Sequence, residues 1–289
     1  MTQQFDRVLR EAIHARGLSL ERLHAHLSQR GIRVSLASLS NWQRGKCRPE
    51  RSHSLRALHA LEEILALPDD TLISSLGPPR PRGRWVRQPR GSLAYRDLCP
   101  VPASLQRLFG EIDHVTDGQL EPVAYHDHFT AGPSRDERAV RTHAVFRARK
   151  SGVDRHVAIH YNEHGRLPDR WSTSFCRPGR VRTDESAGLT AMELLFDRPL
   201  EQDETYVVEY TFGYSGGGPE SSHYNRWFRF PSHSYLLTVQ FEPTARPVRC
   251  FRTRDAGDVA ELRLSGWNAV HLAQAGVAPG VHGIRWEWA

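Results

Sequence analysis

The sequence predicts a two-part protein, in which a bundle of five short helices is followed by an antiparallel β-sandwich. Three observations predict this class. Apolar residues recur at helical spacing over residues 5–76, they alternate as in strands beyond residue 117, and a Pro- and Arg-rich segment separates the two regions. We expect a helical domain at residues 1–76, a basic linker at 77–96, a connecting helix at 97–116 and a β domain at 117–289.

The five helices follow from their apolar faces and from capping residues at their ends. The faces lie at residues 5–13, 20–27, 36–42, 55–65 and 72–76. Ser19 and Ser35 are suited to cap the second and third helices, because a serine hydroxyl can accept a backbone N–H at a helix start. Asp69 is expected to cap the fifth helix.

The segment at residues 77–91 contains four Pro and five Arg, which interrupt any regular element. Beyond it, about ten or eleven segments rich in Val, Tyr, Phe and Thr are separated by Gly, Pro, Asn and Asp. Their spacing is typical of an antiparallel sandwich and not of βαβ units. Aromatic residues such as Trp171, Tyr210 and Trp267 are interpreted as core residues and not as a ligand cage.

Charge divides the chain in the same way. The 289 residues carry a formal net charge of +6. Residues 1–91 hold 16 Lys plus Arg against 8 Asp plus Glu, whereas the remainder holds 23 against 25. A basic first third indicates that the helical domain and linker contact a polyanion.

Several classes are excluded by composition. Apolar runs end well before the roughly 20 residues that a membrane-spanning helix needs. The four cysteines form no C-x-x-C pair, so neither a disulfide framework nor a cysteine zinc site is expected. The first residues lack a secretion signal. We therefore expect a cytoplasmic, nucleoid-associated protein.

The helix expected at residues 36–44 has the character of a helix that reads DNA. It opens with small and polar residues, as a helix entering the major groove requires. The residues Val34-Ser35, then Ser38-Leu39-Ser40-Asn41-Trp42-Gln43-Arg44-Gly45-Lys46 and Pro49, resemble the lambda-repressor-like, XRE-type family of helix-turn-helix domains. This resemblance covers residues 1–76 and implies a five-helix domain that binds an operator.

The outward face of this helix supplies the expected DNA contacts. Ala37, Ser38 and Asn41 are expected to meet base edges, because Leu39 and Trp42 face inward. Phosphate contacts are expected from Arg33, Ser35, Arg44, Lys46 and Arg48. The predicted function is a sequence-specific, XRE-type transcriptional regulator without enzymatic activity. Its expected partners are double-stranded DNA, a second copy in a homodimer, and a small-molecule or protein effector at the β domain, with no membrane.

Two alternatives remain open. The first is an adaptor protein whose β-sandwich binds a protein partner. The second is a metal-binding β domain, for which His126 and His128 are weak candidates because they share one side of a strand. The acidic ligand of the cupin pattern is missing downstream, so no metal and no cofactor are expected. The string from Gly213 to Gly217 matches a nucleophile elbow, but no helix is expected after it.

Overall fold

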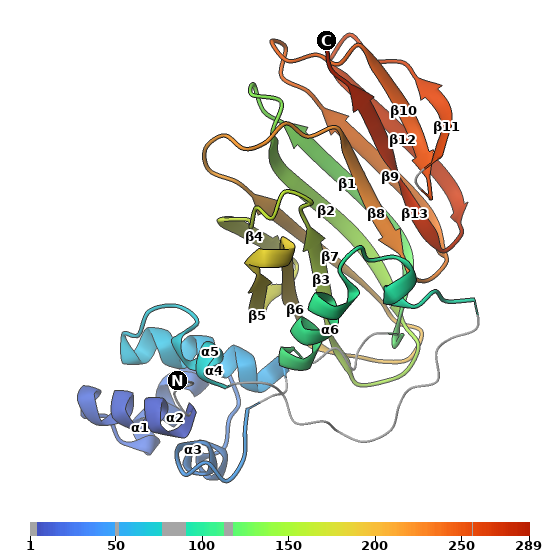
Figure 1. The fold of residues 1–289 in the computed structure, drawn as a ribbon. Helices are drawn as coiled ribbons and strands as arrows, with labels where there is room; N and C mark the ends of the chain where they lie inside the picture. Colours follow the sequence, from blue (N-terminus) through green and yellow to red (C-terminus); the bar gives the residue numbers. More distant parts are fainter. Residues whose placement is uncertain (1–4, 50–51, 77–90, 113–117, 256) are drawn as a thin grey trace.

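The computed structural model describes residues 5–49, 52–76, 91–112, 118–255 and 257–289 (Figure 1). Six α-helices in the described residues precede a C-terminal region that is all-β apart from one short 3-10 turn. The helices and the first 3-10 turn are α1 (Phe5–Arg16), α2 (Leu20–Gln29), α3 (Leu36–Gln43), α4 (Ser52–Leu65), α5 (Thr71–Ser75), η1 (Tyr95–Asp97) and α6 (Pro102–Glu111). Most of the linker predicted at residues 77–96 lies outside the described residues.

Helices α1 to α5 enclose one apolar core, which includes Leu9, Leu23, Trp42 and Leu58. The caps expected at Ser19 and Ser35 are present, because their hydroxyls accept the backbone N–H of the residue three positions later. The cap expected at the start of α5 is wrong. Asp69 does not precede this helix directly, and its N-cap residue Asp70 makes no side-chain cap hydrogen bond.

A residue from the preceding helix satisfies the start of α5 instead. The Glu62 carboxylate accepts the backbone N–H of Leu72 at 2.6 Å and that of Asp70 at 3.2 Å. Glu62 is only 1% exposed, so these bonds satisfy both the buried carboxylate and the helix start. The capping signal was therefore missed because the acceptor is eight residues upstream of Asp70.

The β region consists of three sheets. Its strands are β1 (Leu120–Ala131), β2 (Glu137–Ala148), β3 (Val153–Tyr161), β4 (Arg170–Ser174), β5 (Arg177–Asp184), β6 (Leu189–Leu200), β7 (Thr205–Gly213), β8 (His223–Phe228), β9 (Ser232–Gln240), β10 (Arg249–Arg254), β11 (Gly257–Leu262), β12 (Ala269–Val277) and β13 (Gly280–Glu287), with the turn η3 (Glu185–Ala187) between β5 and β6. The strand orders are β12-β9-β1-β2-β7-β4, β11-β10-β13-β8 and β3-β6-β5.

One face of the six-stranded sheet packs against both smaller sheets. Phe129 and Val140 belong to a core shared with Ile284 on β13. Further along the same face, Phe146 belongs to a core shared with Met192 on β6. The prediction of purely antiparallel pairing is wrong, since β1 and β9 pair in parallel. Burial alternates along most of β9, which is the pattern usual for antiparallel strands, so the sequence carried no sign of the parallel pair.

The helical bundle packs on the outer face of the β3-β6-β5 sheet, where α4 approaches β5 and β6 (Figure 1). Leu195 on β6 is fully buried and belongs to the core of the bundle, whereas its neighbour Leu194 belongs to the inter-sheet core. His59 bonds to the carbonyl oxygen of Pro178 at 2.8 Å, and Arg56 donates to the carbonyl oxygen of Asp197. Both apolar and polar contacts therefore hold the bundle on the sheet.

Helix α6 covers another part of the same outer face. Leu105, Leu108 and Phe109 form a core with Leu189 and Ala191 of β6. Val157, Ile159 and Tyr161 of the edge strand β3 also pack against this core. Within the described part of the chain, no helix combines the length and apolar character needed to span a membrane.

Candidate functional site

The residues expected to contact DNA lie on and after α3. Ala37, Arg33, Ser35, Arg44 and Lys46 are exposed, while the remaining three, Ser38, Asn41 and Arg48, are half-buried. The Ser35 hydroxyl accepts the N–H of Ser38 at 3.1 Å, so this side chain already serves the helix start. The roles proposed for these residues in DNA binding stay predictions.

His126 and His128 lie on the outer face of β1. His126 is exposed and His128 half-buried, and the Asp127 side chain between them points into the protein. The partner of His126 across the strand pair is His143, and that of His128 is Arg141. Burial and the neighbouring charges of His126 and Arg141 lower the pKa of His128. Arg141 is paired with the Glu209 carboxylate at 2.7 Å, and Nδ1 of His143 lies 3.6 Å from the same carboxylate.

A cavity of about 530 Å³ lies where the three sheets meet, and Tyr95 of η1 and Phe109 of α6 contribute to its lining. Cavities of this size are typical of small-molecule sites. Its walls are rich in aromatic side chains, including Tyr95, Phe109, Tyr125, Phe146, Tyr161, Tyr210, Tyr224, Trp227 and Phe228. We call it the β-region cavity. The interpretation of Tyr210 and its neighbours as ordinary core residues is therefore incomplete, since they also form the wall of a cavity.

Strand β3 supplies two histidines to this cavity. Residues 156, 158 and 160 alternate onto the inner face, and β3 is an edge strand that leaves its side open. The ring of His156 lies 4.3 Å from the ring of Phe146, centroid to centroid. Nε2 of His160 lies 2.7 Å from the hydroxyl oxygen of Tyr214, which is fully buried.

Glu137, the first residue of β2, forms the polar end of the cavity together with His160. Its Oε1 lies 3.3 Å from Nε2 of His160, and its Oε2 accepts a hydrogen bond from Nδ2 of Asn162 at 2.8 Å. The carbonyl oxygen of Glu137 accepts a bond from Arg166. The bond from Asn162 thus fixes the orientation of the Glu137 carboxyl, and its other oxygen faces the imidazole of His160.

Burial shifts the pKa values of these groups in opposite directions. It raises the pKa of Glu137 to about 7, although the hydrogen bond from Asn162 and the charge of Arg166 oppose the shift. Burial, helped by the charge of Arg226, lowers the pKa of His156 to about 3 and that of His160 to about 4. Each shift favours the uncharged form of its group. The polar end of the cavity is therefore largely uncharged between about pH 4 and pH 7.

One buried ion pair joins β1 to β8 beside the cavity. The Arg226 guanidinium donates to both oxygens of Asp127, at 2.5 and 2.7 Å. Thr142, Tyr224 and Tyr235 also donate to this carboxylate. Burial disfavours the charge on Arg226, but Asp127 outweighs it and raises the pKa of the guanidinium. The pair is fully hydrogen-bonded and fixes the strand that carries Tyr224 and Phe228.

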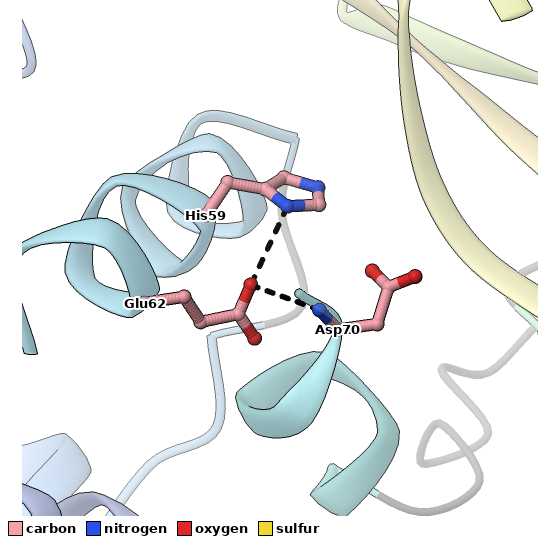
Figure 2. Close-up of side chains that lie close together, drawn as sticks. All are labelled: His59, Glu62 and Asp70. Atoms are coloured by element: carbon pink, nitrogen blue, oxygen red, sulfur yellow. Dashed lines mark hydrogen bonds and ion pairs between the residues drawn. The ribbon is translucent and has the colours of Figure 1, made fainter. Parts of the chain in front are cut away.

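A second cluster of ionisable residues lies at the corner between α4 and α5 (Figure 2). The ligand atoms of His59, Glu62 and Asp70 all lie within 4.8 Å of one another, as a metal site requires. Nδ1 of His59 lies 3.6 Å from Oε2 of Glu62. Glu62, however, already accepts backbone N–H groups at the start of α5. We therefore assign a structural role to this cluster: Glu62 holds the start of α5, and His59 joins the bundle to β5.

Sequence reasoning did not find the residues of the β-region cavity. Glu137, His156, His160 and Asn162 follow no recognised motif spacing. A weak signal exists in β3, where two histidines occupy inward positions of an otherwise apolar strand at a spacing of four. Buried histidines at strand period are unusual enough to mark a polar interior.

Comparisons with known proteins place the chain in no family. No protein-family model matches it, and no curated protein matches it. Among solved structures it is similar to an M1 zinc metallopeptidase from Deinococcus radiodurans, with 15% identity, 57% of this chain and 42% of that chain covered, and a TM-score of 0.33. A mutant of such a peptidase bound to a Tyr-Ser-Ala substrate gives 15% identity, coverage of 58% and 42%, and a TM-score of 0.34. The chain spans less than half the length of these proteins.

These matches do not include the kind of protein predicted from the sequence. They are zinc metallopeptidases and not DNA-binding transcriptional regulators. We do not carry the prediction of a non-enzymatic, XRE-type regulator further, because none of these matches supports it. The H-E-x-x-H pair by which many proteases hold zinc does not occur in the sequence.

Proposed function

We propose that the β region binds a small organic molecule in the β-region cavity. The observation that carries the proposal is a cavity of about 530 Å³ that combines aromatic walls with unpaired polar groups. Within the described residues, Oε1 of Glu137 is buried without a hydrogen-bond partner, and the hydroxyls of Tyr125 and Tyr210 and the ring nitrogens of His156 take part in no hydrogen bond of the structure. Polar groups that line a cavity in this way are available to a ligand.

The arrangement also gives the bound molecule a group with which to exchange a proton. Glu137 and His160 lie 3.3 Å apart at the polar end, and the pKa of Glu137 is raised to about 7. Ionisable groups with shifted pKa values in a cavity are frequent in active sites. Binding is the function we propose, and proton transfer at Glu137 is the chemistry that this end of the cavity favours.

A filling substitution tests the proposal. Val281 on β13 lines the cavity, whereas Val259 on β11 is 55% exposed and lies outside it. We expect small organic molecules that raise the melting temperature of the wild type to act equally on Val259→Trp and to lose their effect on Val281→Trp. Molecules that stabilise Val281→Trp as strongly as the wild type would contradict binding in the cavity.

Two expectations from the sequence stay predictions. The resemblance of residues 1–76 to lambda-repressor-like domains concerns the fold of the helical bundle. Homodimerisation concerns the assembly. The sequence also predicted an effector at the β domain, either a small molecule or a protein. Our proposal is that this effector is a small molecule.

A further inference from the structure

We infer that the ligand of the β-region cavity is uncharged and carries an aromatic ring and a hydroxyl or similar hydrogen-bonding group. The inference rests on the proposed function and adds the chemical class of the ligand. It follows from three features of the wall: the state of its charged side chains, the position of its unpaired polar groups and the arrangement of its rings.

The charged side chains of the wall already have partners within the protein. Arg226 is paired with Asp127 at 2.5 Å, and Arg166 lies 3.6 Å from Asp136. Glu163 lies 3.5 Å from His164 and 3.6 Å from His223, at the mouth. Arg229 donates to the carbonyl oxygen of Leu93 at 3.0 Å and lies over the rings of Tyr95 and Phe230. A ligand charge would therefore be buried with little compensation.

The titratable groups of the interior favour neutrality as well. Glu137 faces His160 and Asn162, with Arg166 and Asp136 nearby, and its charged form is disfavoured by burial. The two inward histidines of β3 are held in their neutral forms for the same reason. Oε1 of Glu137 has no hydrogen-bond partner among the described residues, but burial keeps this carboxyl mostly protonated below about pH 7. In that range a cation would meet little negative charge, and an anion would meet no imidazolium above about pH 4.

The unpaired polar groups lie beside aromatic faces. The ring of Phe146 contacts both Tyr125, at 5.7 Å between centroids, and His156, at 4.3 Å. The Tyr125 ring also meets Phe228 edge-on at 5.6 Å. A ligand ring placed here would stack on these faces while its hydroxyl reached the Tyr125 hydroxyl or an imidazole nitrogen. Benzyl alcohol is a small probe with this combination.

Three probes of the same shape test the inference, namely benzyl alcohol, benzoate and benzylammonium. We expect benzyl alcohol to bind the full-length protein in NMR titrations with a Kd on the order of 1 mM. At pH 6, where the Glu137 carboxyl is mostly protonated, we expect the two ions to bind at least about tenfold more weakly, because their charge then meets no counter-charge in the cavity. Ions that bind in the cavity as tightly as the alcohol would overturn the neutral-ligand inference and leave cavity binding intact. Absence of binding by any probe would overturn the proposed function itself.

A hydroxyl deletion tests the assigned position. Tyr125→Phe should weaken benzyl alcohol binding about threefold to tenfold, since it removes one hydrogen bond. Tyr206→Phe is the matched control, because the Tyr206 hydroxyl already bonds to the carbonyl oxygen of Phe175 and to Asp197 outside the cavity. Equal affinity in the wild type and Tyr125→Phe, or an equal loss in both variants, would overturn the placement beside Tyr125.

Discussion

Nε2 of His160 lies 3.3 Å from Oε1 of Glu137, and both side chains are almost fully buried. Burial raises the pKa of the carboxyl to about 7 and lowers that of the imidazole to about 4. A neutral acid therefore faces a neutral base over a wide pH range. Because both groups are uncharged in this range, the polar end of the cavity can be buried without an ion pair.

Glu137→Gln should change the pH dependence of stability. The unfolded carboxyl loses its proton near pH 4.5 and the folded one near pH 7, so the wild type loses stability as the pH rises between these values. The variant lacks this loss. We therefore compare the free energies of unfolding of the two proteins by urea unfolding at pH 4 and pH 8. Between these pH values the free energy of unfolding of the variant should rise by about 3 kcal/mol relative to that of the wild type. A difference that does not change with pH would contradict the raised pKa.

His156→Phe should act in the opposite direction. The unfolded imidazole gains a proton below pH 6.5, whereas the folded one stays neutral to about pH 3. The wild type therefore loses stability as the pH falls through this range. Between pH 7.5 and pH 5 we expect it to lose about 2 kcal/mol more than the variant. Parallel losses in thermal or urea unfolding would show that His156 is protonated in the folded protein.

Asp127→Asn should be strongly destabilising, because it leaves the Arg226 guanidinium buried without its counter-charge. We expect a loss of about 3–5 kcal/mol in the free energy of unfolding. The exposed pair of Arg249 and Glu261 provides the control, since both side chains are more than half exposed. Glu261→Gln should cost less than about 1 kcal/mol. Similar losses in the two variants would contradict the role assigned to the buried pair.

Leu195→Ala should loosen the helical bundle from the β3-β6-β5 sheet. Both Leu194 and Leu195 are fully buried, but only Leu195 belongs to the core of the bundle. Each alanine variant should cost about 2–5 kcal/mol. Amide hydrogen exchange in α1 to α5 should accelerate more in Leu195→Ala than in Leu194→Ala. Equal acceleration in the two variants would contradict the docking face.

Glu62→Gln should lower the pKa of His59. Burial alone would lower this pKa, but the hydrogen bond and charge of Glu62, with the Pro178 carbonyl, raise it above its ordinary value. Removal of the charge leaves burial dominant. An NMR titration of the His59 ring measures the change. Glu63→Gln is the control, because Glu63 is 68% exposed and pairs with Arg30; an equal effect of both substitutions would contradict the assignment.

The helices and most strands were predictable because they follow local rules. Apolar and polar residues alternate in the segments that form β2, β3, β7, β9 and β10, and this alternation predicted those strands. Serine caps marked the starts of α2 and α3. Pairing was not predictable. The parallel contact of β1 with β9 and the division into three sheets depend on tertiary packing that alternation does not encode.

Side-chain environments were only partly predictable. Trp171 and Trp267, interpreted as core residues, are 41% and 87% exposed. Aromatic type alone does not distinguish a core position from an exposed one, and it does not show that Tyr125 and Tyr210 surround a cavity. The cavity forms from β1, β2, β3, β7 and β8 together. Its site could therefore not be read from the spacing of any one segment.

The most direct test of cavity binding is the electron density of a crystal of the full chain soaked in benzyl alcohol above its measured Kd. The account predicts density for one ring against Phe146, with its hydroxyl near Tyr125 or His156. Density at another place in the protein, with the cavity unchanged, would contradict the central claim.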